Sequence, residues 1–127
     1  MTNLRHEEYQ LQCAVADYLR YQLPHGVYWT AISHGTNLGV TPTARLIRGR
    51  RLKRAGHKAG VADIFLSWKS PTDPMPSVAW IEMKSKRGAL SVEQKGFRDE
   101  VRALGHEYVV ARGIDDVQRA LEAWGLK

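Results

Sequence analysis

Two short stretches, GVADIFL (residues 60–66) and WIEMK (residues 80–84), determine the fold and the site that we expect for this chain. Both are apolar runs that include a few charged residues, and such runs predict strands. Side chains alternate across a strand, so Glu82 and Lys84 are expected on one face and Ile81 and Met83 on the other. An acid and a base here are poorly explained by packing, although a plain surface pair on an edge strand is the simpler alternative.

Asp63, in the first stretch, favours a functional site because it is a second acid inside an apolar run. If the two strands pair, Asp63 lies beside Glu82, and close carboxylates repel each other unless a cation neutralises them. Oxygen ligands with little sulfur or imidazole nearby suit a hard cation, usually magnesium. Such a cation binds a phosphate oxygen and lowers the pKa of a coordinated water. Lys84 is expected to orient that water and to stabilise charge that develops on phosphorus.

The rest of the sequence predicts a mixed α/β domain around these two strands, with the order α-β-α-β-β-α-β-α and one domain spanning residues 1–127. Apolar spacing predicts a helix from Leu4 to about Leu23, and Ser91 with Gln94 matches a capping box that opens a helix closed by Gly105. The other expected elements are a strand at 27–33, a loop at 34–40, a helix that opens at Thr41-Pro42 and stops near Gly56, strands at 61–68, 78–84 and 106–111, a loop at 69–77, and a helix at 114–124.

Positive charge is concentrated in one segment of the chain. The net charge is +6, yet residues 45–58 carry seven basic side chains and no acid, so the remainder carries −1. The alternative is a solvated helix face, but like charges this close repel each other, which favours nucleic acid as the partner. Phosphate contacts of this kind predict DNA binding with little sequence preference. The expected contact residues, in one groove, are Arg45, Arg48, Arg50, Arg51, Lys53, Arg54, Lys58, Lys86 and Arg87.

Composition argues against several classes of protein. The single cysteine, Cys13, allows neither an intramolecular disulfide nor a CxxC metal knuckle, which favours a reducing compartment, and we expect the cytoplasm. No stretch approaches the roughly 18 apolar residues of a membrane span, so no membrane partner is expected. The first eight residues are polar and carry acids, unlike a secretory signal.

The ordered set of motifs resembles the PD-(D/E)XK nuclease superfamily and, more narrowly, the VRR-NUC (virus-type replication-repair nuclease) domain. The ExK triplet Glu82-Met83-Lys84 is weakly specific alone, but a glycine before the aspartate and a glutamine after the lysine make the set much more specific. One departure is Ala62, where family members usually have proline. Proline supplies no ligand, so little chemistry depends on it. The resemblance covers Glu8, Gln12, the basic segment, residues 55–66 and 81–84, Gly88-Ala89-Leu90-Ser91, and Gln94 to Gly105.

The resemblance implies a restriction-endonuclease-like core and a metal-dependent DNA endonuclease that hydrolyses phosphodiester bonds. Asp63, Glu82 and the backbone carbonyl of Met83 would bind Mg²⁺ or Mn²⁺. Lys84 would hold or activate the attacking water.

Two further catalytic residues, Glu8 and Gln94, are also implied by the resemblance. Glu8 would reach the site from the first helix, through a water or at a second metal, and Gln94 would contact Lys84 or the nucleophile. The alternatives are a solvated helix end for Glu8, which the helix dipole favours, and the capping box for Gln94. Asn37 is a further candidate for lining the site, and His57 for a phosphate contact.

The resemblance also implies branched DNA, such as junctions or flaps, as substrate, and a homodimer. The main alternative is a nucleic-acid-binding module without catalysis, which would keep the basic cluster but has no use for Asp63, Glu82 and Lys84 in this order. The second alternative is an RNA-cleaving enzyme of the same architecture, because carboxylate–metal chemistry needs no 2′-hydroxyl.

Overall fold

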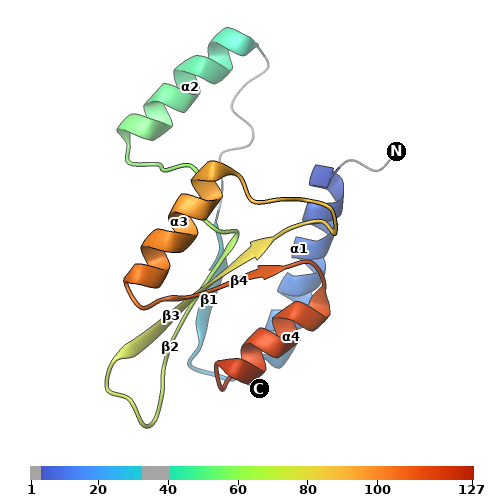
Figure 1. Ribbon diagram of the computed structural model, residues 1–127, viewed down its shortest axis with the longest axis vertical. Helices are drawn as coiled ribbons and strands as arrows, with labels where there is room; N and C mark the ends of the chain where they lie inside the picture. Colours follow the sequence, from blue (N-terminus) through green and yellow to red (C-terminus); the bar gives the residue numbers. More distant parts are fainter. Residues whose placement is uncertain (1–3, 33–40) are drawn as a thin grey trace.

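The part of the chain that the structure describes, residues 4–32 and 41–127 of a computed structural model, contains four helices and four strands in the predicted order (Figure 1). The α/β class is therefore confirmed. Ser33, the expected 34–40 loop and Asn37 lie outside the described residues. The elements are α1 (Leu4–Gln22), β1 (Tyr28–Ala31), α2 (Pro42–Arg54), β2 (Ile64–Lys69), β3 (Pro76–Met83), α3 (Val92–Ala103), β4 (Glu107–Ala111) and α4 (Ile114–Ala123).

The four strands form one mixed sheet in the order β1-β2-β3-β4. The pairs β1–β2 and β2–β3 are antiparallel, whereas β3 and β4 are parallel and are joined by the crossover through α3. Pro76 is the first residue of β3, a position where the missing N–H of proline costs little. The strand with the ExK triplet is therefore central in the sheet, which rules out the edge-strand alternative for Glu82 and Lys84.

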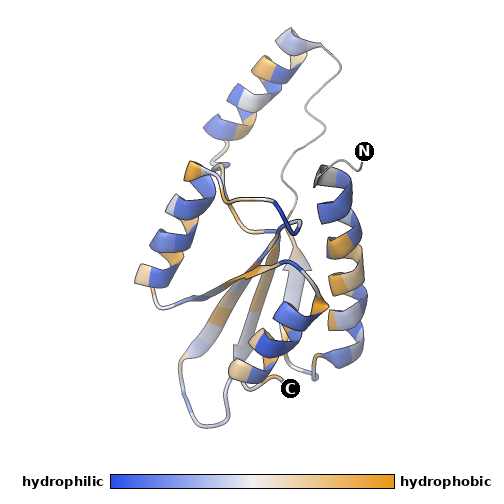
Figure 2. Ribbon diagram, turned by 45° about the vertical axis from the view of Figure 1, so that its right-hand side comes forward, coloured by the Kyte–Doolittle hydropathy of each residue, from blue (hydrophilic) through white to orange (hydrophobic). Residues whose placement is uncertain are grey.

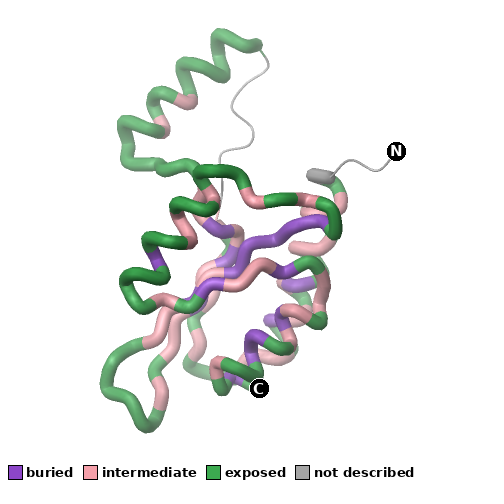
Figure 3. The backbone as a smooth tube through the Cα atoms, in the orientation of Figure 1, coloured by how far each residue is buried: buried purple, intermediate pink, exposed green. Residues whose placement is uncertain are grey.

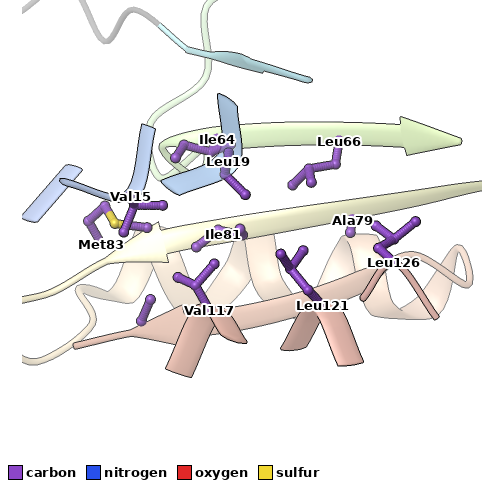
Figure 4. Close-up of a cluster of buried hydrophobic side chains, with 11 residues drawn as sticks. Val15, Leu19, Ile64, Leu66, Ala79, Ile81, Met83, Val117, Leu121 and Leu126 are labelled. Carbon is purple, nitrogen blue, oxygen red and sulfur yellow. The ribbon is translucent and has the colours of Figure 1, made fainter. Parts of the chain in front are cut away.

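Helices cover both faces of the sheet (Figure 1). On one face α1 and α4 pack against each other and against the strands, with Leu19, Ile64, Ile81 and Leu121 fully buried between them (Figure 4). On the other face α3 covers a smaller cluster built around Ala62, Val101 and Tyr108. Side-chain alternation along the strands divides the residues between the two layers. No described helix is long and apolar enough to cross a membrane.

The helix α2 stands apart from these layers. None of its residues is buried, and it projects from one end of the molecule (Figures 1 and 3). The Thr41 hydroxyl caps its start by accepting the Ala44 N–H at 3.0 Å, and Pro42 follows the cap as predicted. The helix continues unbroken through Gly49 to Arg54, because one glycine costs only about 1 kcal/mol.

The helix α3 begins at the predicted capping box. The Ser91 hydroxyl accepts the Gln94 N–H at 3.1 Å, and Gln94 Oε1 accepts the Ser91 N–H at 2.9 Å. This helix start packs onto Gly60, whose φ is +90° and where any Cβ would overlap the Glu93 carbonyl. The close approach requires glycine, because it leaves no space for a side chain.

The two charged strand segments end slightly differently from the prediction. The strand β2 starts at Ile64 and β3 stops at Met83, so Asp63 and Lys84 lie one residue outside their strands. The first difference follows the turn at Gly60, which delays strand pairing until Ile64. Lys84 remains tied to the sheet, since its N–H donates to the Ala111 carbonyl at 3.0 Å.

Candidate active site

Asp63 and Glu82 lie opposite each other at the end of the β2–β3 pair. The register pairs Ile64 with Ile81, and continuing it by one residue places Asp63 against Glu82. Directly opposed residues of antiparallel strands point to the same face, with Cβ atoms roughly 4.5–5.5 Å apart. The strand pairing assumed from the sequence therefore occurs and brings the two carboxyl groups together.

Glu82 is buried, with only 2% of its surface exposed, and its Oε1 has no hydrogen-bond partner within residues 4–32 and 41–127. Burial raises the pKa of its carboxyl to about 10, and the Asp63 carboxyl adds to the shift through a hydrogen bond and charge repulsion. Lys84 opposes the shift, and Glu8 adds weakly to it. Burying an acid in this way is costly unless a proton or a cation neutralises it.

The Asp63 carboxylate is held by the backbone of the neighbouring strand. Its Oδ2 accepts the Met83 N–H at 2.7 Å, while the Asp63 carbonyl accepts the Ile32 N–H at 2.8 Å. The Met83 side chain belongs to the apolar core, so Met83 has only backbone atoms to offer at this site. These contacts orient one carboxylate toward the other.

The donor set suits a hard divalent cation. Two carboxylates and nearby backbone oxygens match the ligands of Mg²⁺ or Mn²⁺, and the unpartnered Oε1 of Glu82 is an acceptor in need of a positive group. No three His, Cys, Asp or Glu side chains in the described ranges lie close enough to form a metal cluster on their own. A cation here would therefore depend on Asp63 and Glu82 together with backbone or water oxygens, and Glu8 is not drawn into a three-carboxylate cluster.

Lys84 and Glu8 meet beside the carboxylate pair. Lys84 is only 8% exposed, and its Nζ lies 4.0 Å from Oε1 of Glu8, which α1 brings to the end of β3. At 4.0 Å this is an ion pair without a direct hydrogen bond. The structure thus places Glu8 beside Lys84. The expected role of Glu8, through a water or at a second metal, stays a prediction.

The backbone at Gly88 lies against Ser85, Glu8 and Lys84, which is possible because glycine has no side chain. A Cβ on Gly88 would lie 2.9 Å from Ser85 Oγ and 3.4 Å from both Glu8 Oε1 and the Lys84 Cδ atom. Ser85 is itself buried, and its Oγ has no hydrogen-bond partner in the described structure. Polar groups of Ser85, Glu8 and Lys84 are therefore packed closely around Gly88.

Arg112, which was not among the predicted residues, holds the turn that follows Lys84. Its Nη1 donates to the Ser85 carbonyl at 2.7 Å and to the Gly88 carbonyl at 2.6 Å, and its own N–H donates to Asp116 Oδ2 at 2.8 Å. The only sequence signal was a lone arginine at the end of a strand. Its partners are 27 and 24 residues away, a separation that no local pattern predicts.

Tyr108 is the second residue that sequence reasoning missed. It lies beneath α3 on the face that carries Glu82, and its buried hydroxyl lacks a hydrogen-bond partner among the described residues. Burial raises its pKa to about 12, and the negative charges of Glu82 and Asp63 contribute. A tyrosine in an apolar strand resembles an ordinary core residue, so nothing in the sequence indicated that Tyr108 lies near Glu82.

Gln94 is occupied by the cap of α3. Its Oε1 accepts the Ser91 N–H, which is the alternative role considered from the sequence, and no hydrogen bond links Gln94 to Lys84 in the described part of the chain. The helix start that contains it lies on Gly60, three residues before Asp63. The backbone of Gln94 therefore lies close to the segment that carries Asp63, while its side chain caps the helix.

The basic residues fall into two places. An open cleft of about 940 Å³ separates α2 from the segment that leads to Asp63, and it is lined by cations of both. Lys86 and Arg87 are exposed in the turn after β3 and do not line this cleft. The basic residues on its walls are Arg45, Arg50, Lys53 and Lys58, with His57 beside them, whereas Arg48, Arg51 and Arg54 lie elsewhere on α2.

Comparison with known proteins supports the resemblance at the level of the fold. No family model matches this sequence, and no curated protein matches it. A solved structure described as "VRR_NUC domain protein" matches with a TM-score of 0.65 over 99% of this chain and 93% of that chain, at 20% sequence identity. At this identity the match concerns architecture, and it extends over nearly the whole of both chains. The chain therefore has the fold of a VRR_NUC domain protein.

Proposed function

We propose that this chain is a metal-dependent nuclease that hydrolyses phosphodiester bonds of DNA, with a PD-(D/E)XK core in a single domain. The observation that carries the proposal is the opposed pair Asp63 and Glu82, in which Glu82 is buried with an unpartnered oxygen beside the buried ammonium of Lys84. Such an arrangement costs stability and has no packing benefit, so a catalytic use accounts for it. The VRR_NUC name of the structural neighbour agrees with this chemistry.

Each residue has a distinct task in the proposed reaction. Asp63, Glu82 and the Met83 carbonyl hold Mg²⁺ or Mn²⁺, which when bound acts as a Lewis acid toward a phosphate oxygen. Lys84 donates to the attacking water and stabilises the negative charge that develops on the phosphoryl oxygens. Glu8 holds the Lys84 ammonium in place.

In the proposed reaction the amide nitrogen of Gln94, which the cap does not use, contacts the nucleophile or Lys84. This is a smaller role than direct contact through Oε1 would allow.

The proposed substrate is DNA, with branched forms such as junctions or flaps preferred, and a homodimer would present two sites to such a molecule. The exposed cations of α2 and of the 86–87 turn supply phosphate contacts. Support for branch selectivity comes only from the likeness to VRR-NUC proteins. A panel of single-stranded, duplex, flap and four-way-junction DNA, each with and without Mg²⁺, measures this selectivity directly.

The catalytic assignment is tested by Glu82→Gln and Lys84→Met, with the exposed residues Glu107 and Lys69 changed in the same way as matched controls. We expect each site variant to lower the magnesium-dependent cleavage rate by at least roughly a hundredfold while DNA affinity stays the same. The controls should cut as fast as the parent. Parent-like rates in both site variants, in folded protein, would show that this is not the active site.

Two other functions give different results in the same panel. A non-catalytic binding module binds the DNA forms but cleaves none of them with any divalent metal. An RNA-cleaving enzyme cuts the corresponding RNA strands and leaves DNA intact. The burial of Glu82 opposite Asp63 favours an enzyme over the binding module, because binding alone needs no buried acid.

A further inference from the structure

The exposure of α2 is unusual for a helix of 13 residues. None of its side chains is buried, and Leu46 and Ile47 are 55% and 45% exposed (Figure 3). Most helical stability in proteins comes from packing an apolar face, and helices this short are marginal without it. Most of the helix is coloured as hydrophilic in Figure 2. A helix of this kind is expected to gain its packing from a partner.

The charges of α2 surround the helix axis. The helix carries six cations and no acid. At about 100° per residue, these cations leave no sector wider than about 80° without a positive charge. One set faces the cleft and the other lies on the opposite side of the helix. The cleft-side set is Arg45, Arg50 and Lys53, and the outer set is Arg48, Arg51 and Arg54.

This distribution indicates an anionic partner that lies on both sides of the helix. A flat anionic surface, such as a membrane or the outside of a duplex, needs cations on one side only. A groove between two rows of phosphates contacts both sides at once. The major groove of B-form DNA is about 12 Å wide and admits a helix about 10–12 Å across, whereas the minor groove, about 6 Å wide, does not.

We infer that α2 inserts into the major groove of duplex DNA, with its cleft-side and outer cations contacting the phosphates of the two strands. The exposed Leu46 and Ile47 would contact base edges, such as thymine methyl groups, without strong sequence preference. The inference rests on the proposed function and extends it, by naming B-form duplex as the part of the substrate that this helix binds.

The cleft connects this binding mode to the carboxylates. Its lining runs from α2 through residues 55–61 and ends two residues before Asp63. The DNA strand whose phosphates contact the cleft-side cations therefore passes toward Asp63 and Glu82. The other strand lies on the outer side of α2, away from the site.

The test measures binding of the full chain in EDTA, where no cleavage occurs, so that its result is independent of nuclease activity. Three triple variants to glutamine, which preserves helix propensity, are compared by fluorescence anisotropy over a range of salt concentrations. They change the cleft-side set, the outer set, and a control set of exposed cations on other elements, Arg20, Lys69 and Arg119. The probes are a DNA duplex, its single strand and the RNA duplex of the same sequence.

Major-groove insertion predicts that both α2 variants lose at least tenfold in affinity for the DNA duplex. The slope of log affinity against log salt should fall by about two to three in each, and the control should match the parent. Binding to the RNA duplex should be unaffected by the outer set, because the A-form major groove is too narrow. A DNA duplex with bulky glucosyl groups in its major groove should bind as weakly as the α2 variants do.

Three results would overturn the inference. Loss confined to the cleft-side variant would place DNA on one side of the helix only. Equal loss for DNA and RNA duplexes would indicate general attraction to polyanions, and stronger binding to anionic vesicles than to DNA would indicate a membrane surface. If the binding pattern holds but the parent cuts no DNA with Mg²⁺, the proposed function fails while the groove contact stands.

Discussion

Glu82 occupies an environment that opposes its ionisation. It lies on the central strand beneath α3, opposite Asp63, and its pKa is raised to about 10 mainly by burial. Lys84 offsets part of this effect, but it is also paired with Glu8. The carboxyl of Glu82 therefore keeps a proton at neutral pH, and the proposed cation would have to displace that proton on binding.

A pH-dependent stability follows from this raised pKa. Between pH 4.5, the ordinary value for Glu82, and about 10, the folded state holds a proton that the unfolded state has lost. The free energy of unfolding should therefore fall as pH rises through this window. Thermal unfolding in EDTA from about pH 5 to about pH 9 measures the slope, and Glu82→Gln should flatten it.

The exposed Glu107 on β4 provides the control, since Glu107→Gln should leave the slope unchanged. A slope in Glu82→Gln equal to that of the parent would mean that Glu82 does not hold the proton.

Among the elements, the start of α3 depends most on its neighbours. The capping box stabilises the helix locally, but the contact with Gly60 determines where the helix sits on the sheet. Gly56 and Gly60 both have positive φ in the segment between α2 and β2, yet a Cβ on Gly56 would meet open space. A substitution at Gly56 therefore adds backbone strain alone, whereas a substitution at Gly60 adds both strain and a steric clash.

Replacing each glycine with alanine should lower the free energy of unfolding by different amounts. Gly56→Ala should cost roughly 1–2 kcal/mol, the strain of a positive φ alone. Gly60→Ala should cost at least about 1–3 kcal/mol more, because α3 must move away from its carbonyl contact. Urea titration of the two variants gives the difference, and equal losses would mean that the Gly60 contact does not hold α3.

At the scale of the whole molecule, the sheet with α1, α3 and α4 forms the packed body, and α2 lies outside it (Figure 1). The strand β3 is paired on both sides and carries Ala79, Ile81 and Met83 into the main core. A helix without buried side chains opens without disturbing this core, whereas β3 opens only with global unfolding.

Amide hydrogen exchange in the absence of DNA should separate these two parts. We expect amides within α2 to exchange at least roughly a thousandfold faster than those of β3, because opening α2 exposes little apolar surface. Mass spectrometry of exchanged peptides or NMR resolves the difference. Protection of α2 equal to that of β3 would mean that the helix is part of the cooperative core.

The sequence by itself determined the local features of this protein. Apolar spacing, the Thr41 and Ser91 caps and the position of the glycines predicted the order of the elements, because these signals act between residues a few positions apart. The same reasoning identified Asp63, Glu82 and Lys84 as charges that packing does not explain. The strand ends differ from the prediction, since pairing partners decide where β2 begins and β3 stops.

Only the tertiary structure decided how these residues meet. The register that opposes Asp63 to Glu82, the burial of Lys84 and the contacts of Arg112 with the Ser85–Gly88 turn all join segments far apart in the chain. The same is true of α2: its basic residues are plain in the sequence, but the absence of any buried residue in this helix is not. Chain folding sets these distances through the packing of whole elements, which no local pattern of residues encodes.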